Sequence, residues 1–218
     1  MKIALVRGAF LNQYEAQLYY PLLEKDELVG FSSFHPLHEQ FPFPVVKLYS
    51  PMDLDFGRFQ RWKMPVLNRL FVDAHLLIGL EGRLTGFDIA HCADTFYGFT
   101  HQCLKAKREG RVKKVVATIF ENIPFNNEGI RGRKEFKKYA IMNVDRFISI
   151  SKRSKAALIL EGAPEKNIEV LGQHIDTERF KPRDFSNSRN ELTILFAGRL
   201  EFYKGVYEVI FSAKKRAQ

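Results

Sequence analysis

The chain has 218 residues, with 34 Lys and Arg against 25 Asp and Glu, so its net charge is +9 when histidine is neutral. This length corresponds to about one and a half domains of roughly 150 residues, which argues against a complete two-domain enzyme. Hydrophobic residues make up 45% and charged residues 27% of the chain, and this near-average composition excludes disordered and collagen-like proteins.

The two cysteines, Cys92 and Cys103, are too few and too far apart for a zinc ribbon, a redox pair or a disulfide scaffold. They favour a reducing compartment. At the N-terminus the apolar run 3–6 ends at Arg7, well short of a signal-peptide core, and no run approaches the roughly 18 residues of a membrane span. These features predict a cytoplasmic protein. We expect no metal, because no ligand cluster has metal spacing, and we expect no other cofactor.

Short β-branched and aliphatic runs alternate along the chain with segments whose apolar residues have helical spacing. Strands are predicted at 2–6, 28–34, 45–49, 87–92, 115–120, 146–150 and 168–171. Helices are predicted at 14–24, at 59–80 with Pro65 as a kink or as the start of a second helix, at 97–109 and at 152–161. This order predicts an α/β domain with a doubly wound, largely parallel, Rossmann-like sheet covered on both faces, which binds ligands at the carboxyl ends of its strands.

The excess positive charge lies in one segment. Residues 105–155 contain 15 Lys and Arg against 5 Asp and Glu, a net of +10, and the rest of the chain carries a net of −1. A further helix is predicted there, with Phe136, Tyr139 and Ala140 turned inward. Its basic residues are Arg131, Arg133, Lys134, Lys137 and Lys138. Such a helix is either an ordinary solvated face or a surface for anionic lipid headgroups or an anionic acceptor. Nucleic acid is not an expected partner, because no nucleic-acid-binding motif accompanies the charge.

The composition changes at 172–190, which is poor in apolar residues and contains Pro182 with several Ser and Asn, as is typical of a linker. A strand at 192–197, a turn at Gly198 and a helix at 203–216 are predicted beyond it. The chain is therefore divided into a domain at 1–171, a hinge at 172–190 and a strand and helix at 191–218 that are too small to form a domain.

Two motifs lie at the hinge and just after it. Residues 168–182 read I-E-V-L-G-Q-H-I-D-T-E-R-F-K-P, and residues 195–205 read L-F-A-G-R-L-E-F-Y-K-G. In this order they resemble family 4 glycosyltransferases of the GT-B fold, in which an I-D-T-E-R-F-K-P hinge precedes a G-R-L-x-x-x-K-G loop. The resemblance is specific from residue 147 onward and loose before it. It implies that 1–171 is the N-terminal, acceptor-side domain of a retaining transferase, and that 191–218 begins the domain that binds a nucleotide-diphosphate sugar.

The resemblance also implies residues that bind the donor phosphates. The donor leaves as a diphosphate, so fixed cations beside its oxygens lower the barrier. Arg199 and Lys204 match the family's phosphate-binding Arg and Lys, and Lys204 is expected at a helix N-terminus, which favours anions. A surface Arg and Lys at an ordinary turn are the alternative. Gly8 matches a glycine that approaches the phosphates after the first strand, but Ala9 replaces its usual neighbour, so an ordinary turn is an equal alternative.

Two residues are expected near the acceptor. His91 matches the first histidine of a His-x-His pattern that the family often carries at the acceptor pocket, whereas Ala93 replaces the second. At the end of the next strand the family often has another histidine, where this chain has Phe120 followed by Glu121. Glu121 is therefore expected to face the cleft without a structural arginine partner, and to bind a sugar hydroxyl or act as a base. For both His91 and Glu121 a purely structural role is the alternative.

The family's second domain carries an E-x7-E pair for the donor, and no such pair is present in residues 191–218, where this domain begins. We therefore expect an acceptor-domain fragment of a glycosyltransferase that is inactive alone. The alternatives are a non-catalytic binding protein for anionic lipid or glycan, and an α/β domain whose motifs are relics. The expected partners are a nucleotide sugar, a sugar or lipid acceptor, an anionic membrane surface at which the protein is peripheral, and a second copy that pairs through residues 191–218.

Overall fold

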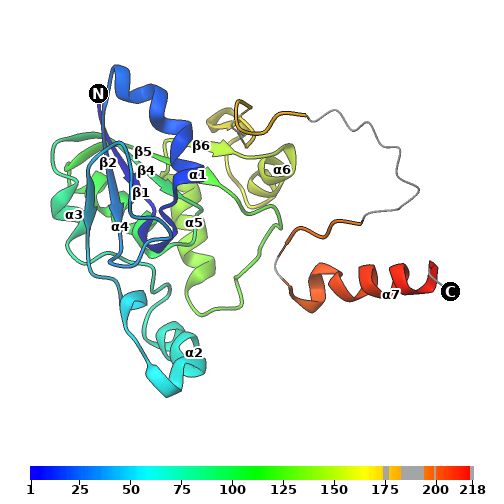
Figure 1. Ribbon diagram of the computed structural model, residues 1–218. Helices are drawn as coiled ribbons and strands as arrows, with labels where there is room; N and C mark the ends of the chain where they lie inside the picture. The colour runs from blue at the N-terminus through cyan, green and yellow to red at the C-terminus, as the bar shows by residue number, and fades with distance from the viewer. Residues whose placement is uncertain (174–176, 183–193, 199, 217–218) are drawn as a thin grey trace. The chain divides into compact units, whose positions relative to one another are not determined.

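The computed structural model describes residues 1–173, 177–182, 194–198 and 200–216 (Figure 1). The chain forms two compact units, one within residues 1–174 and the other within 175–218. The first unit is an α/β domain built on one parallel sheet, and the second contains a short helix. In the described part of the chain no helix is long and apolar enough to cross a membrane.

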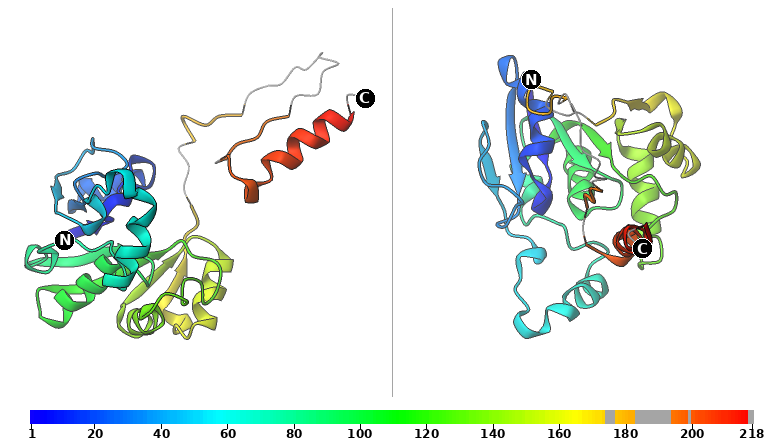
Figure 2. Two further views of the ribbon diagram at one scale, coloured as in Figure 1. Left: turned by 90° about the horizontal axis from the view of Figure 1, so that it is seen from below. Right: turned by 45° about the vertical axis from the view of Figure 1, so that its right-hand side comes forward.

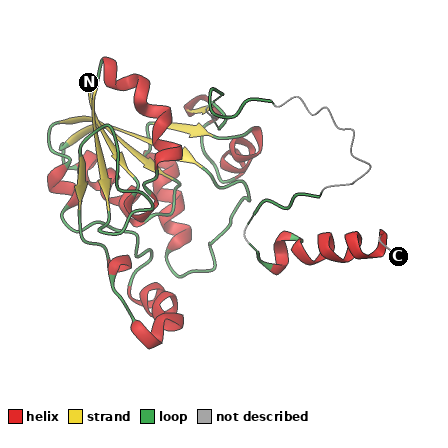
Figure 3. Cartoon of the chain, in the orientation of Figure 1, coloured by secondary structure: helices red, strands yellow, loops and turns green. Residues whose placement is uncertain are grey.

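The first unit contains a seven-stranded sheet with the strand order β3-β2-β1-β4-β5-β6-β7, in the part of the chain that the structure describes (Figure 3). All neighbouring strands are parallel. This confirms the predicted fold class, and each predicted strand before the hinge is present. The strands are β1 Lys2–Val6, β2 Glu27–Ser32, β3 Val45–Lys47, β4 Phe87–Ala93, β5 Val112–Ile119, β6 Arg146–Ser149 and β7 Ile168–Val170.

Helices and short 3-10 segments connect these strands. The helices are α1 Gln13–Ala16, α2 Gln60–Leu70, α3 Leu80–Arg83, α4 Gly98–Arg108, α5 Arg133–Asn143, α6 Lys152–Leu160 and, in the second unit, α7 Val206–Arg216. The 3-10 segments are η1 Gly8–Phe10, η2 Gln17–Glu24, η3 Pro51–Asp53, η4 Gly57–Phe59, η5 Glu165–Asn167 and, in the second unit, η6 Phe202–Lys204. The local sequence explains several boundaries. For example, Ser151 caps α6 by accepting a hydrogen bond from the Ser154 N–H, and Gly110 follows α4 with a φ of 71°.

The two faces of the sheet are covered to different extents. One face is fully covered by α3 to α6, which bury alternate strand residues such as Ala4, Ala90 and Val115 in the main core. On the other face, α1, η2 and the segment around Phe43 cover β1 and β2 and form a smaller core with Leu5 and Leu28.

The prediction that both faces are covered is therefore only half right. On the second face η2 covers part of β4, where Tyr19 packs on His91, but in the described part of the chain no helix covers β5 and β6, and Val116 and Ile148 are half-buried there. The cause is the strand order. The crossovers from β3 to β7 all run in one direction across the sheet, and right-handed connections in one direction place their helices on one face. Two connections run in the other direction, from β1 to β2 and from β2 to β3, and the second of them has no helix.

Three predicted elements differ from the structure. The predicted helix at 14–24 is mostly 3-10 helix, and Pro21 lies within it and cannot donate a helical hydrogen bond. The predicted helix at 59–80 is two helices separated by residues 71–79, and Pro65 lies inside the first. The strand predicted at 192–197 is absent where it is described, at 194–197, because its described surroundings provide no neighbouring strand. Residues 192 and 193 lie outside the described part.

Candidate functional site

The carboxyl ends of the strands bring together three loops of the first unit, which Figure 1 shows below β1 and β4. The loop after β1 begins at Gly8, whose φ of 55° is left-handed. A side chain at this position would be strained, and its Cβ would lie 3.4 Å from the Phe99 ring. Glycine therefore allows the loop to pack on the start of α4. This packing accounts for Gly8 without a ligand, and its contact with donor phosphates stays a prediction.

An Asp and His pair that we did not predict lies beside this loop, in the segment between α2 and α3. The N–H of His75 Nδ1 points at the Asp73 carboxylate, 3.1 Å from Oδ1 and 3.2 Å from Oδ2. The Asp73 Oδ1 atom also accepts the Gly98 N–H, at 2.9 Å, and Oδ2 accepts a bond from Arg133 Nη2, at 2.8 Å. Although burial opposes ionisation, the hydrogen bonds from His75 and Gly98 and the charge of Arg133 hold the pKa of Asp73 below its ordinary value.

The imidazole of His75 lies among aromatic rings at this edge. Its centroid is 5.0 Å from that of Phe10, in a stacked arrangement, and 5.3 Å from that of Tyr97. Because Asp73 holds Nδ1, the Nε2 atom is the nitrogen that can meet a ligand, and 13% of the side chain is exposed. The D-x-H spacing at 73–75 was the available sequence signal, but we assigned these residues to a helix.

Asp94 and Glu121 follow β4 and β5. The Asp94 carboxylate accepts hydrogen bonds from the N–H groups of Phe120 and Glu121 at 2.9 and 3.2 Å, and this joins the two strand ends. Burial is the main cause that raises the pKa of Asp94 to about 6, and the neighbouring charge of Glu121 adds to it. Asp94 is thus a buried acid that titrates near neutral pH.

The carboxylate of Glu121 is engaged by its own loop. Its Oε1 atom accepts the N–H groups of Asn122 and Ile123, both at 2.9 Å, and Oε2 accepts a bond from the Asn126 side chain. The expectation that Glu121 faces a cleft without a structural arginine partner stays a prediction. The loop contacts explain the residue structurally, and its catalytic role stays a prediction.

His91 lies elsewhere, on the uncovered face of the sheet. It lines a cavity of about 740 Å³ between η2 and β6, together with Tyr19, Thr118 and Ile148. Its Nε2 atom is 2.8 Å from Thr118 Oγ1, and Tyr19 packs edge-on against its ring. Burial, with the nearby charge of Arg7, lowers the pKa of His91 well below its ordinary value, so the imidazole is neutral at pH 7.

The structure therefore does not place His91 and Glu121 in one cavity. Glu121 lines a separate small pocket with Asp94, Lys137 and Glu161. The reason is the strand pleat. His91 points to the open face from within β4, whereas Glu121 comes after the end of β5.

Arg7 is a further buried charge, and in the sequence it only marked the end of the apolar run 3–6. Its Nε atom binds Glu15 at 2.6 Å, its Nη1 binds the carbonyl of His91 at 3.0 Å, and its Nη2 binds the Tyr19 hydroxyl at 2.9 Å. Although burial disfavours its charge, Glu15 raises the pKa of Arg7, so it stays protonated. These bonds connect α1 to the end of β1, beside the cavity that His91 lines.

The predicted basic surface at α5 is wrong at two positions. Arg133 and Lys137 are 6% and 2% exposed, so neither can face a membrane. Arg133 binds Asp73, and Lys137 Nζ binds Glu161 at 2.5 Å. Their partners are 60 and 24 residues away in the sequence, which is why helical spacing could not reveal this burial. The other predicted basic residues are exposed, and they are Arg131, Lys134 and Lys138.

In the second unit, Lys204 ends the turn η6 and is exposed, with its ammonium 5.3 Å from the centroid of the Tyr203 ring. Gly205 separates it from α7 with a φ of 77°, so Lys204 precedes the helix. Arg199 lies outside the described residues. In the described part of the chain, no group of three His, Cys, Asp or Glu side chains is placed to hold a metal ion.

Comparison of the sequence with protein-family models and with curated proteins gives no match. Among solved structures, Anabaena HepE in complex with UDP is 15% identical, with a TM-score of 0.54 over 82% of this chain and 45% of HepE. HepE in complex with UDP and glucose is 16% identical, with a TM-score of 0.56 over 84% of this chain and 47% of HepE. A weaker match, the lipopolysaccharide galactosyltransferase WaaB, is 15% identical with a TM-score of 0.47 over 86% of this chain and 50% of WaaB.

The two HepE matches establish the fold of the chain. The sheet and its helices are arranged as in one part of HepE, and the chain spans a little under half of HepE's length. The family 4 resemblance depends on the sequence motifs, because the identity to HepE is too low to carry more than the fold.

Proposed function

We propose that the first unit is the acceptor-side half of a nucleotide-sugar-dependent, retaining glycosyltransferase of family 4, with the hinge at 172–190 and the start of the donor-binding half at 191–218. The main support is the sheet, which matches HepE in strand arrangement and collects its polar loops at the carboxyl edge. HepE has been seen with UDP and with glucose. The motifs at 168–182 and 195–205 favour the same family.

The acceptor site of this proposal lies at the carboxyl ends of β1 and β4. The Nε2 atom of His75 accepts a hydrogen bond from an acceptor hydroxyl, and Asp73 holds the ring in the orientation this requires. The rings of Phe10 and Tyr97 provide an apolar surface for one face of a sugar ring. Glu121 keeps the loop after β5 in place through its bonds to that loop. Asp94 supports the same loop through its backbone bonds.

The donor side of this proposal depends on cations. Lys204 and Arg199 stabilise the diphosphate as the sugar–phosphate bond breaks. Two phosphate contacts without nucleoside contacts give an affinity of about millimolar or weaker. Since the chain spans under half of HepE, we expect the 218 residues alone to transfer no sugar.

Saturation-transfer NMR tests the acceptor site, with the 218-residue chain and a panel of monosaccharides and lipid-linked sugars. We expect transfer to at least one sugar, and His75→Ala should weaken that binding by about tenfold, because it removes one directed hydrogen bond. His35→Ala, at an exposed histidine, is the matched control and should have no effect. Binding unchanged by His75→Ala, or no binding to any sugar, contradicts the proposed site.

Donor binding is tested separately by calorimetry with UDP-glucose and by an assay for UDP release. We expect millimolar or weaker affinity and no turnover. Micromolar affinity, or sugar transfer by the chain alone, would contradict the assignment as one half of the enzyme.

The second candidate function is a non-catalytic protein that binds anionic lipid or glycan. The exposure of Arg131, Lys134 and Lys138 favours it, because these cations are free to meet an anionic surface. It predicts binding to anionic vesicles that weakens with salt and is lost on Lys134→Glu with Lys138→Glu. Equal binding to neutral and anionic vesicles would reject it.

A further inference from the structure

Helix α2 and the residues on either side of it project from the sheet. In Figures 1 and 2 this cyan segment extends beyond the carboxyl ends of the strands, away from the other helices of the first unit. Its attachment is narrow. Leu67 is buried on the side that faces the domain, and Lys63 Nζ binds the carbonyl of Met52 at 2.7 Å. Most of the helix surface is therefore accessible.

The accessible side of α2 carries an apolar stripe. Phe59, Trp62, Val66 and Leu70 are spaced by three, four and four residues, so they lie along one side of the helix. They are 66%, 51%, 40% and 70% exposed. Large apolar side chains that line up on one exposed helix face indicate a surface that binds another apolar phase.

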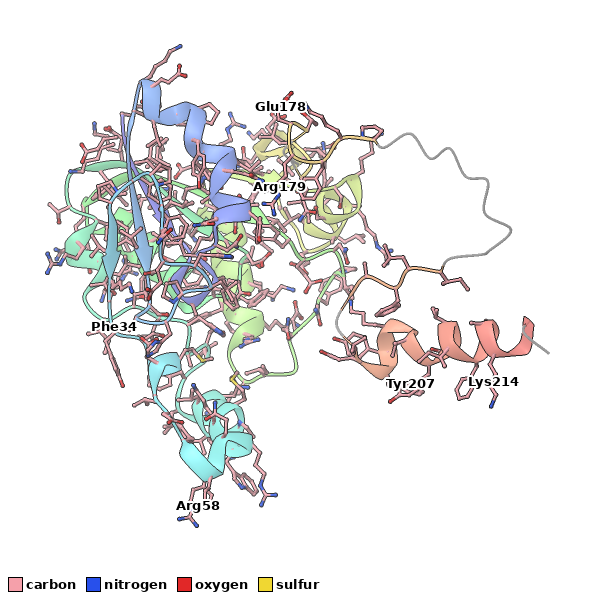
Figure 4. All side chains as sticks on the ribbon, in the orientation of Figure 1. Phe34, Arg58, Glu178, Arg179, Tyr207 and Lys214 are labelled. Carbon is pink, nitrogen blue, oxygen red and sulfur yellow. The ribbon has the colours of Figure 1, made fainter. Side chains whose placement is uncertain are left out.

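The charged residues of α2 and of its nearest neighbours in the sequence are positive, whereas Asp55 lies at the edge of the projecting segment. Residues 56–72 contain four basic residues and no acidic residue. The basic residues are Arg58, Arg61, Lys63 and Arg69. Arg58 lies at the far end of the segment, where Figure 4 shows its side chain pointing away from the domain. The guanidinium of Arg61 is 5.7 Å from the centroid of the Trp62 ring, so cationic and apolar groups lie side by side.

The start of α5 packs just beyond the end of α2. Gly132 packs against Val72, just beyond α2, so closely that an added Cβ would lie 2.8 Å from Val72 Cγ2. Arg133 Nε binds the Val72 carbonyl at 3.2 Å. These contacts hold the start of α5, where Arg131 and Lys134 are exposed, beside Val72 just beyond the end of α2.

We propose that α2 binds the surface of an anionic lipid bilayer, with its apolar stripe in the interface and its arginines among the headgroups. An amphipathic helix with tryptophan and phenylalanine on one side and arginines on the other is suited to this position. An acidic protein would also complement the positive charge. Binding such a protein, however, would not require four large apolar side chains along the exposed length of the helix. The inference is independent of the proposed transferase function.

The chain offers a direct probe, because Trp62 is its only tryptophan. The experiment titrates the 218-residue protein with vesicles of phosphatidylglycerol and phosphatidylcholine, and with vesicles of phosphatidylcholine alone, and records tryptophan emission and sedimentation. With the anionic vesicles we expect emission to shift to shorter wavelength, and quenching by lipids brominated in their acyl chains. Raising the salt concentration should weaken binding.

Two double variants with equal charge changes test the surface. Arg58→Glu with Arg61→Glu should weaken binding to anionic vesicles by on the order of 100-fold, since each cation near the surface contributes several-fold. Lys152→Glu with Arg153→Glu, at exposed positions of α6, should have little effect. Both pairs are exposed, so neither should impair folding, which circular dichroism checks.

A third variant, Phe59→Ser with Leu70→Ser, keeps the charge and should weaken both binding and the emission shift. The proposal is overturned if emission does not shift with anionic vesicles at low salt, or if the two charge variants lose binding equally. It is also overturned if emission shifts with protein concentration in the absence of lipid, because that result would assign the stripe to contact between copies of the chain.

Discussion

Asp94 has an unusual position for a carboxylate. It follows β4 with a φ of 47°, which is left-handed, and the residue is 5% exposed. Asp tolerates this backbone conformation better than most residues, because its short side chain can bind nearby backbone groups. Here it binds the N–H groups of Phe120 and Glu121. The burial of Asp94 also raises the pKa of its carboxyl group. The ionised carboxylate therefore connects the ends of β4 and β5 at a cost in folding free energy.

Stability should therefore depend on pH through Asp94. Between the ordinary value of 3.8 and the folded value of about 6, the folded protein keeps a proton that the unfolded chain has released. Rising pH then favours unfolding, and stability is lost as pH rises through about 6. Asp94→Asn keeps an acceptor oxygen and cannot ionise. We expect its stability relative to the wild type to increase by about 2–3 kcal/mol between pH 4 and pH 7.

Urea unfolding at several pH values measures this difference. Asp88→Asn, at an exposed ion pair on the same strand, is the control and should give no such increase. His91 acts in the opposite direction, because its lowered pKa removes stability as pH falls through its ordinary value of 6.5. The comparison of variant with wild type removes this contribution. A constant difference across the pH range would show that Asp94 does not titrate as described.

At the scale of elements, α5 illustrates how charge pattern and burial can disagree. Its sequence suggests one basic face, but the helix buries Arg133, Lys137, Ala140 and Ile141, and so two cations lie on the inner side. Both have carboxylate partners in other elements. A buried ion pair adds little net stability, but removal of one member leaves an uncompensated charge.

Lys137→Met should accordingly destabilise the protein by about 3–5 kcal/mol, because Glu161 remains buried without its partner. Lys134→Met, three residues earlier and exposed, should change stability by less than about 0.5 kcal/mol. Chemical unfolding measures both. The double variant Lys137→Met with Glu161→Gln should recover part of the loss. Equal, small effects at positions 134 and 137 would mean that the ion pair is not buried in solution.

At the scale of the whole molecule, the second unit exposes many apolar side chains in its described residues. Leu195, Leu200, Phe202 and Phe211 are 86%, 79%, 75% and 67% exposed. Exposed apolar groups in this number favour association with a partner surface. The prediction of pairing between copies through 191–218 remains to be tested.

We expect the protein to form a dimer as its concentration rises. Ile210→Ser with Phe211→Ser on α7 should shift the equilibrium to the monomer, because it removes exposed apolar surface without opening a core. Light scattering over a concentration series measures both proteins. A monomer at high concentration in the wild type would reject the prediction, and a dimer unaffected by the substitutions would assign the contact to another surface.

Local sequence was sufficient for the strands of the first unit and for α4 and α6. The β-branched run of β5 and the serine cap of α6 act within a few residues, so their positions follow from neighbouring side chains. The same information predicted Glu121 at a strand end, because the end of a strand is a local feature. It is also the basis for the predicted hinge and for the motifs that resemble a glycosyltransferase family, since these are read directly from residue order.

Strand order and partners distant in sequence were decided by the tertiary structure alone. The order of β1 to β7 determines which face the helices cover, and it leaves His91 on an open face away from Glu121. Long-range pairing also buries Lys137 against Glu161 and joins Arg133 to the Asp73 carboxylate that holds His75. Periodicity reports one element at a time, whereas burial and ion pairing depend on what that element packs against, and this is the physical reason for the difference.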